Sequence, residues 1–342
     1  MRGDDIGQPL LEIRHLEKRF ALDQGFLETL RFRKGRITRE RREVHAVNDV
    51  SLGIARGEAL CVVGESGCGK STVARLIAGL LTPSSGSVLY DGTRIDTLSG
   101  RALRPFRRKM QMIFQTPYAS LNPRMTIQQT LEEPVRNHFH GLPRAQVEDK
   151  MAEVMRAVGV DPNWAKRYPH EFSGGQRQRI AIARALTVDP EFVVADEPIS
   201  ALDVSIQAQV LNLMLEAKDE RGLTYLFITH DLSVVQHFGT RVAVLYLGTL
   251  CELADTATLF ANPRHPYTKA LLSAVPQLKD DHPNHIRLRG EIPTPINMPT
   301  GCPFKSRCSY ANDRCGAEHP RPLRQPDGAL VACHAVEEDR LG

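Results

Sequence analysis

Short apolar stretches alternate with stretches of helical spacing along the first three quarters of the chain. Short apolar runs typical of buried strands occur at 59–63, in "EFVVAD" and in "TYLFITHD", and "PLLEIRHLEKRF" near the N-terminus is also strand-like. Residues with helical spacing occur in "KSTVARLIAGLL", at 126–136 and 144–158, in "QRQRIAIARALTVD" and before "TYLFITHD". Strands that alternate with helices predict an α/β fold with a largely parallel sheet.

This regular pattern ends near residue 255. The segment "FANPRHPYTKALLSAVP" predicts one short helix between prolines, and residues 290–326 are Pro-rich and irregular. A stretch with so little periodicity needs another source of order, such as a metal or a partner. We therefore predict a large α/β domain over 1–255 and a small irregular C-terminal domain over 256–342.

Composition and charge exclude several classes of protein. The 342 residues are 42% apolar and 25% charged, which is ordinary for a globular protein, and the formal net charge of +4 does not by itself indicate nucleic-acid binding. No apolar run is long enough to span a bilayer, and the N-terminus lacks a signal-peptide pattern. We expect a cytosolic protein with reduced thiols and no structural disulfides.

The segment "GESGCGKS" at 64–71 fits the pattern G-x-x-x-x-G-K-[ST]. It follows an apolar strand and opens a helix, which favours a phosphate loop over a glycine turn with an exposed lysine. Lys70 would reach the β and γ phosphates, and Ser71 would coordinate Mg²⁺. The predicted cradle comprises Gly64, Glu65, Ser66, Gly67, Cys68, Gly69, Lys70, Ser71 and Thr72.

A second chemical signal is "FVVADEP" at 192–198, where an apolar strand ends at two acids. Asp196 could hold Mg²⁺, directly or through water, and Glu197 could polarise an attacking water. The alternative is an ordinary strand followed by an acidic turn. Because the phosphate loop occurs in the same chain, the catalytic interpretation is favoured.

A third signal is "FSGGQRQR" at 172–179, in which two glycines precede a predicted helix. It predicts a second anion-binding helix N-terminus, formed by Ser173, Gly174, Gly175 and Gln176. One nucleotide does not need two such cradles. A head-to-tail dimer would explain both, because each chain's second cradle would close over the nucleotide held by the other.

Together these motifs resemble the nucleotide-binding subunit of ABC transporters, in which "SGGQ" is the signature sequence. The resemblance covers about residues 10–260, with Phe172 in place of the signature's usual leading Leu. It implies a P-loop NTPase (RecA-like) core, an inserted helical subdomain over about 116–180 and antiparallel β elements near the N-terminus. Further family positions are matched by Phe20 (adenine stacking), Gln115 (Mg²⁺ and the nucleophilic water), Asp203 in "SALD", and the switch residue His230.

The resemblance implies ATP hydrolysis with Mg²⁺ held by Ser71, Gln115 and Asp196. Lys70 and the loop amides would neutralise the phosphates, Glu197 would orient or deprotonate water, and His230 would contact the γ-phosphate. Each single residue keeps a simpler interpretation. Phe20 could be a core aromatic, Gln115 a plain loop residue and His230 a polar residue after a strand.

The segments "NPRHPYTKALLSAVP" and "GEIPTPINMPTGCPFKSRC" resemble the C-terminal region of oligopeptide/dipeptide importer ATPases, most closely the second ATPase of a non-identical pair. This implies an ATPase that powers import of peptides or a related small solute. The implied partners are a second ATP-binding subunit, two permease subunits and an extracytoplasmic solute-binding protein, with no nucleic acid. The chain would lie peripherally at the cytoplasmic face of the inner membrane.

Two other functions stay open at this point. An ABC ATPase acting in DNA repair or translation is disfavoured, since no heptad run for a coiled coil separates Gln115 from Ser173 and there is only one cassette. A metal- or redox-responsive regulator is the other. The basic segment 31–42 is compatible with contact to anionic lipid or a permease loop, or with a solvated loop.

Four of the seven cysteines lie in the C-terminal region, at Cys302, Cys308, Cys315 and Cys333. Four thiolates can bind zinc or an iron–sulfur cluster, but no C-x-x-C pair of a zinc ribbon is present. Free buried thiols are the third possibility. The resemblance implies a [4Fe–4S] cluster, with zinc as the alternative. Cys61 and Cys68 lie in a strand and in the phosphate loop, so we do not expect them to bind metal.

Overall fold

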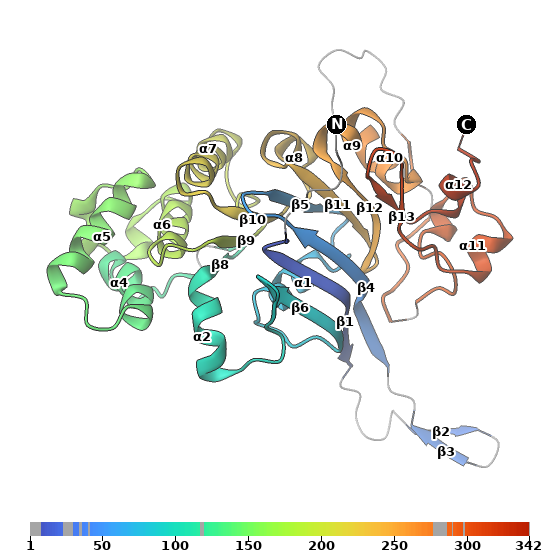
Figure 1. Cartoon of the computed structure of the whole chain (residues 1–342), viewed down its shortest axis with the longest axis horizontal. Helices are drawn as coiled ribbons and strands as arrows, with labels where there is room; N and C mark the ends of the chain where they lie inside the picture. Colours follow the sequence, from blue (N-terminus) through green and yellow to red (C-terminus); the bar gives the residue numbers. More distant parts are fainter. Residues whose placement is uncertain are drawn as a thin grey trace.

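The structure is a computed structural model that describes residues 8–22, 30–33, 36–39, 42–116, 120–275, 286–288, 290–296 and 298–341, without the side chains of residues 30–39. The described residues contain an eight-stranded sheet, a four-stranded sheet and a two-stranded hairpin. Figure 1 shows the larger sheet in the middle of the molecule, with a helical lobe on one side and the C-terminal segments on the other.

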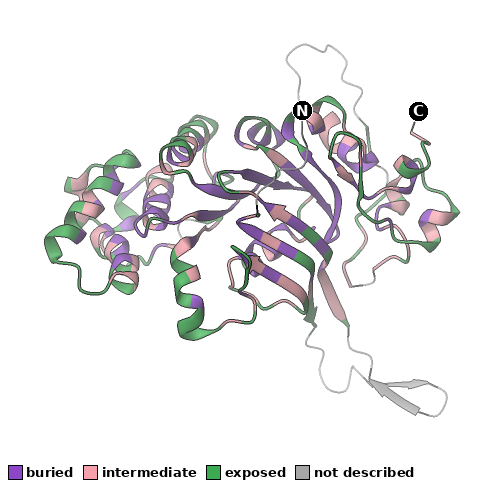
Figure 2. Ribbon diagram, in the orientation of Figure 1, coloured by how far each residue is buried: buried purple, intermediate pink, exposed green. Residues whose placement is uncertain are grey.

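The parallel part of the large sheet has the strand order β11-β5-β10-β9-β8. The strands are β5 (Ala59–Val63), β8 (Met110–Ile113), β9 (Phe192–Asp196), β10 (Thr224–Ile228) and β11 (Arg241–Tyr246). Every residue of β5, β9 and β10 is buried, as expected for parallel strands covered on both faces. Figure 2 shows this buried centre in purple, and the predicted α/β fold with a largely parallel sheet is confirmed.

The smaller sheet is antiparallel and has the strand order β4-β1-β6-β7, which confirms the antiparallel elements expected near the N-terminus. Its strands are β1 (Leu11–Ala21), β4 (Glu43–Ile54), β6 (Ser85–Tyr90) and β7 (Thr93–Arg94). Buried Leu11, Ile13 and Leu16 belong to a hydrophobic cluster shared with the large sheet.

The basic segment 31–42 includes the antiparallel hairpin of β2 (Leu30–Arg33) and β3 (Arg36–Arg39). Its side chains up to residue 41 lie outside the described residues. The predicted contact of this segment with lipid or a permease therefore stays a prediction.

The helices separate into those beside the strands and those of the helical lobe. The first group is α1 (Lys70–Ile77), α2 (Gly100–Lys109), α7 (Val204–Arg221) and α8 (Leu232–Phe238). The lobe contains α4 (Ile127–His138), α5 (Arg144–Ala157), η1 (Pro162–Lys166), η2 (Pro169–Glu171) and α6 (Gly174–Leu186), packed through their apolar faces. Helix α1 is shorter than the predicted 70–81, because the chain turns at Gly79, which has φ 64°.

The C-terminal residues are more ordered than the irregular pattern predicts. Helix α10 (Pro266–Ser273) is the short helix predicted between prolines, and a further helix, α9 (Thr256–Ala261), precedes it. The later elements are η3 (Lys305–Arg307), α11 (Asp313–Ala317), β13 (Leu323–Arg324), β14 (Leu330–Val331) and α12 (His334–Glu337). Strand β14 pairs with β12 (Thr249–Asp255), so the chain returns to extend the large sheet. Among the described helices, none has both the length and the apolar composition needed to cross a bilayer.

Candidate nucleotide-binding and catalytic site

The phosphate loop joins the buried strand β5 to helix α1, in the strand–loop–helix order that the sequence predicts. Two of its glycines are required by close backbone contacts. A Cβ on Gly64 would lie 2.2 Å from the carbonyl oxygen of Leu245, and one on Gly69 would lie 2.2 Å from that of Ala46. Both residues also have positive φ values, which a residue with a Cβ adopts only with strain.

The lysine and serine that follow these glycines are held by hydrogen bonds. Lys70 is buried, and its Nζ donates to the carbonyl oxygens of Gly64 at 2.8 Å and Glu65 at 3.0 Å. Ser71 Oγ donates to Asp196 Oδ1 at 2.8 Å. Burial raises the pKa of the Asp196 carboxyl, while the Ser71 hydrogen bond opposes that rise. Two of the three predicted protein ligands of Mg²⁺, Ser71 and Asp196, therefore lie side by side.

The predicted catalytic residues meet where neighbouring parallel strands end. Glu197 directly follows β9, and Gln115 and His230 follow β8 and β10. Gln115 Nε2 donates to Glu197 Oε2 at 2.8 Å, and His230 Nδ1 lies 3.5 Å from Glu197 Oε1. Glu197 itself has φ 47°, a backbone strain of the kind that occurs at functional sites. A carboxylate fixed between an amide and an imidazole can orient or deprotonate a water molecule.

A cleft of about 420 Å³ lies beside these residues. It is lined by Gln115 and Asp196 together with Arg75, Phe114, Thr116, Ser120 and Arg184. The sequence analysis did not single out Arg75 or Arg184. No motif marked them. Arg75 lies on α1 and Arg184 on α6, and the apolar and polar positions of these helices are those of any helix with one buried and one exposed side.

The second predicted cradle begins helix α6. Ser173 caps the helix, with its Oγ accepting from the Gln176 amide at 3.3 Å and its own amide donating to Gln176 Oε1 at 3.0 Å. Gly175 is required by packing, since a Cβ there would lie 2.5 Å from Cγ2 of Ile206. Phe172 is buried with its ring 5.9 Å from that of Trp164, as expected for the residue below this loop.

The structure keeps this cradle apart from the chain's own phosphate loop. Helix α6 packs on β8, α4, α5 and α7, whereas α1 packs on β4, β9 and β10 (Figure 1). Asp203 lies at the start of α7. Phe20 lies near the end of β1 and is 36% exposed, with Lys18 Nζ 5.0 Å from its ring centroid. The described contacts thus bring the predicted Mg²⁺ ligands and the catalytic residues together. They do not bring the signature residues at 173–176 into that group.

Two residues that the sequence analysis missed hold the phosphate loop from the C-terminal side. Arg307 forms two hydrogen bonds with the Glu65 carboxylate, at 2.6 and 3.0 Å, and Tyr267 Oη accepts from the Glu65 amide at 2.9 Å. No local pattern could have shown this contact, because Glu65 and Arg307 are 242 residues apart.

The four C-terminal cysteines are free and near one another. The Cys302 amide donates to the Cys315 carbonyl oxygen at 2.8 Å. Burial raises the pKa of the Cys302 thiol to about 12 and also raises those of Cys308 and Cys333, and the thiols of the set add to these shifts. Among the described residues, however, no three His, Cys, Asp or Glu side chains are arranged as a group that could hold a metal ion. The residue types and their proximity suit a metal centre, but the arrangement does not support one.

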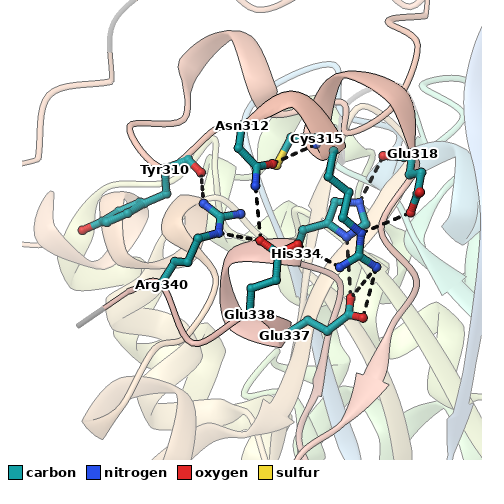
Figure 3. Close-up of polar contacts among 9 residues, drawn as sticks. Tyr310, Asn312, Cys315, Glu318, His334, Glu337, Glu338 and Arg340 are labelled. Carbon is teal, nitrogen blue, oxygen red and sulfur yellow. Dashed lines mark hydrogen bonds and ion pairs between the residues drawn. The ribbon is translucent and has the colours of Figure 1, made fainter.

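Ion pairs and hydrogen bonds tie the segment of Cys315 to the last helix, α12 (Figure 3). Asn312 accepts from the Cys315 amide at 3.1 Å and donates to Glu338 at 3.2 Å. Arg340 donates to Glu338 at 2.6 Å and to the Tyr310 carbonyl oxygen at 2.5 Å. Arg314 pairs with Glu318, Glu337 and Glu338. These contacts hold the segment of Cys315 against the residues at and after α12.

The strand–loop–helix cradle and the carboxylate at the sheet edge define the class of protein, which is a P-loop ATPase of the ATP-binding cassette type. Residues 47–200 match the family described as "ABC transporter", and residues 251–315 match "Oligopeptide/dipeptide transporter, C-terminal region". Over 330 residues the chain is 49% identical to the "Probable peptide ABC transporter ATP-binding protein y4tS" of Sinorhizobium fredii, covering 96% of this chain and 90% of that protein. The chain belongs to the ABC transporter ATPases that carry the oligopeptide/dipeptide C-terminal region.

Other comparisons agree with this family. The "Dipeptide transport ATP-binding protein DppF" of Escherichia coli is 47% identical over 335 residues, covering 98% of this chain and 96% of that protein. Among solved structures, the dimeric ATP-binding cassette MJ0796 bound to ADP and Pi superposes with a TM-score of 0.62 at 28% identity, covering 72% of this chain and 98% of that chain. The chain is therefore an ATP-hydrolysing transporter subunit, and the DNA-repair, translation and regulator alternatives have no support.

Proposed function

We propose that this ATPase powers the import of peptides, or of a related small solute, through a separate membrane permease. The observation that carries the proposal is the catalytic group of Gln115, Glu197 and His230 in a chain whose residues 251–315 match the oligopeptide/dipeptide C-terminal region. The names of relatives that are 47–49% identical, which refer to peptide and dipeptide transport, support the same solute class.

The reaction proposed for the site is phosphoryl transfer to water. Lys70 and the amides of the phosphate loop would neutralise the phosphates, and Ser71 with Asp196 would hold Mg²⁺, joined by Gln115. Glu197 would orient or deprotonate the water, with Gln115 and His230 fixing its carboxylate. Phe20, whose ring is partly exposed, would stack on the adenine.

The signature residues are proposed to act on the nucleotide of a second ATP-binding subunit. The signature residues Ser173, Gly174, Gly175 and Gln176 begin α6, and Asp203 precedes α7. These two helices pack on each other, whereas α1 packs on β4, β9 and β10, so a head-to-tail dimer would complete both sites. The similarity to a dimeric cassette supports this arrangement. We propose that the partner is a non-identical ATPase, and that two permease subunits and an extracytoplasmic solute-binding protein complete the importer.

We propose two units in the chain: a nucleotide-binding domain over 1–255, with a helical subdomain over about 116–180, and a C-terminal extension over 256–342. Contact with the permeases would place the chain peripherally at the cytoplasmic face of the inner membrane.

A direct test is to co-express the chain with its permeases, partner ATPase and solute-binding protein, and to measure ATP hydrolysis in proteoliposomes. We expect peptide-loaded binding protein to stimulate hydrolysis. Hydrolysis that is indifferent to peptide would contradict the peptide assignment.

We further propose that Cys302, Cys308, Cys315 and Cys333 hold a [4Fe–4S] cluster, with zinc as the alternative. The proposal rests on the family resemblance and on the proximity of the four buried or half-buried thiols. The side chains would have to turn toward a common centre, since they are not arranged as a metal group now. Anaerobically purified protein should be brown and contain iron and sulfide. Colourless protein with one zinc per chain would favour zinc, and protein without bound metal would show that the four cysteines are free thiols.

A further inference from the structure

The Glu65 carboxylate is the one acidic side chain within the predicted phosphate cradle at 64–72. A negative charge in a loop that binds polyphosphate is unfavourable unless it is neutralised. The structure neutralises it with Arg307, whose guanidinium forms a two-bond pair with both carboxylate oxygens at 2.6 and 3.0 Å. Only 7% of the Arg307 side chain and 25% of the Glu65 side chain are exposed, so solvent screens this pair less than a surface ion pair.

The turn that carries Arg307 is fixed by aromatic packing. Phe304, at the start of η3, is buried with its ring 5.2 Å from that of Tyr246 and 5.4 Å from that of Tyr267. Tyr267 Oη accepts from the Glu65 amide, and the Arg307 guanidinium lies 5.9 Å from the centroid of the Tyr246 ring. The C-terminal turn and the phosphate loop are therefore parts of one packed unit.

The same loop segment also positions the phosphate-binding lysine. Lys70 Nζ donates to the backbone carbonyl oxygen of Glu65 at 3.0 Å, while the side chain and amide of Glu65 are held by Arg307 and Tyr267. A shift of Glu65 would therefore alter the loop backbone that holds Lys70. This gives Arg307 two effects on nucleotide binding: it removes a repulsive charge, and it fixes the loop.

We propose that Arg307 is a positioning residue of the phosphate loop, through which the C-terminal segment sets the affinity for MgATP. The proposal rests on the nucleotide-binding role of the loop and goes beyond it, because it assigns a part in ATP binding to a residue of the C-terminal extension. It needs no metal in the cysteine segment.

The test measures equilibrium binding of MgATP to the full-length chain in a Glu197→Gln background, so that hydrolysis does not interfere. We expect Arg307→Gln to weaken binding by roughly tenfold, the effect of leaving one carboxylate unpaired beside a bound anion. Arg307→Lys should give a smaller loss, since it keeps the charge but not the two-bond geometry. In the hydrolysing chain, Arg307→Gln should raise KM while kcat stays within about twofold.

Two control variants separate this role from general loosening of the C-terminal segment. Lys305→Gln removes a cation from the same turn, where Lys305 donates to the Thr300 carbonyl oxygen and not to the loop. Arg314→Gln breaks the ion pairs with Glu318, Glu337 and Glu338. We expect both variants to bind MgATP as the parent does, even if Arg314→Gln lowers the melting temperature. Equal losses of affinity in Arg314→Gln and Arg307→Gln would overturn the proposal.

A rescue experiment tests the charge itself. In Glu65→Gln/Arg307→Gln no unpaired carboxylate remains, so most of the affinity lost in Arg307→Gln should return. Additive losses in the double variant would show that the pair is not the cause and would overturn the proposal, as would unchanged affinity in Arg307→Gln. Failure of the parent chain to bind MgATP at all would instead contradict the ATPase assignment.

Discussion

The edge of the parallel sheet and the C-terminal residues 301–341 both gather polar side chains, but by different means. At the sheet edge, β8, β9 and β10 end side by side, so Gln115, Glu197 and His230 meet because the strands are in register. In the C-terminal region the regular elements are two to five residues long, and order comes from aromatic packing, ion pairs and caps. The first arrangement is set by the register of regular strands and the second by irregular side-chain contacts.

This difference predicts that a change at the sheet edge affects chemistry, whereas a change in the C-terminal region affects stability or nucleotide affinity.

Glu197→Gln should lower ATP turnover by roughly 10²- to 10⁴-fold, because an amide cannot accept the proton of the attacking water. Binding of MgATP and the melting temperature should change little. Steady-state hydrolysis and equilibrium binding measure the two effects. Glu191→Gln is the matched control, since Glu191 precedes β9 and pairs with Arg56 and Lys109 near the surface. Turnover within threefold of the parent would remove Glu197 from the mechanism.

Phe304→Ala should lower the free energy of unfolding by about 3–5 kcal/mol, the usual cost of emptying a buried phenylalanine site. The loss should appear first as cleavage of the C-terminal region in limited proteolysis, and only afterwards as unfolding of the α/β core. Leu323→Ala is the control, because Leu323 is 43% exposed in the same region. If the core and the C-terminal region unfold together in both variants, they form a single cooperative unit and are not two regions of different stability.

The sequence could place Glu197 and His230 at the sheet edge because each follows a short buried run, whereas Gln115 follows the partly buried strand β8 and was expected from the family resemblance alone. "FVVAD" and "TYLFI" define β9 and β10, and their last residues fix where Glu197 and His230 must lie. The glycines of the phosphate loop were predictable from the motif G-x-x-x-x-G-K-[ST], and the structure gives the reason for two of them, because Gly64 and Gly69 leave no room for a Cβ.

The C-terminal contacts could not be predicted in the same way. Glu65 and Arg307 are 242 residues apart and Asn312 and Glu338 are 26 apart, and no periodic pattern or motif marks either pair. Strand β14 is two residues long, too short for any hydrophobic alternation to show that it joins β12. The expected metal site illustrates the same limit, because spacing alone does not fix where four thiols point.

Gly175→Ala should destabilise the chain by about 1–3 kcal/mol through packing, before any effect on nucleotide is considered. A Cβ at this position would lie 2.5 Å from Cγ2 of Ile206, a branched side chain on α7 that cannot easily move away. Gly174→Ala is a close control, since its Cβ would lie 3.8 Å from Leu202, an ordinary contact distance. Thermal or denaturant unfolding compares the two, and equal stabilities would show that α6 and α7 can separate at little cost.

The smallest effect concerns pH and the buried His265 before helix α10. Its ring accepts a hydrogen bond from the Tyr267 amide at 3.0 Å, and burial lowers its pKa from 6.5 to about 3. Because the folded pKa is lower than the unfolded one, protons bind preferentially to the unfolded chain. The stability contribution is therefore complete above the unfolded pKa and is lost as pH falls below 6.5 toward 3.

We expect His265 to account for about 1.4 kcal/mol of lost stability between about pH 7.5 and 5.5. His265→Asn should remove that part of the dependence of stability on pH, because asparagine can still accept a hydrogen bond from the Tyr267 amide but does not titrate. The neighbouring Glu252 carboxyl accepts from the His265 amide, and its pKa is raised, chiefly by burial, so it contributes a slope of opposite sign. The difference between parent and variant cancels that contribution. His237→Asn, at an exposed position of α8, should keep the full slope. If the stability of His265→Asn falls with pH as steeply as that of the parent, the folded chain must accept the proton on His265. The C-terminal region would then open around His265 more readily than its packing indicates.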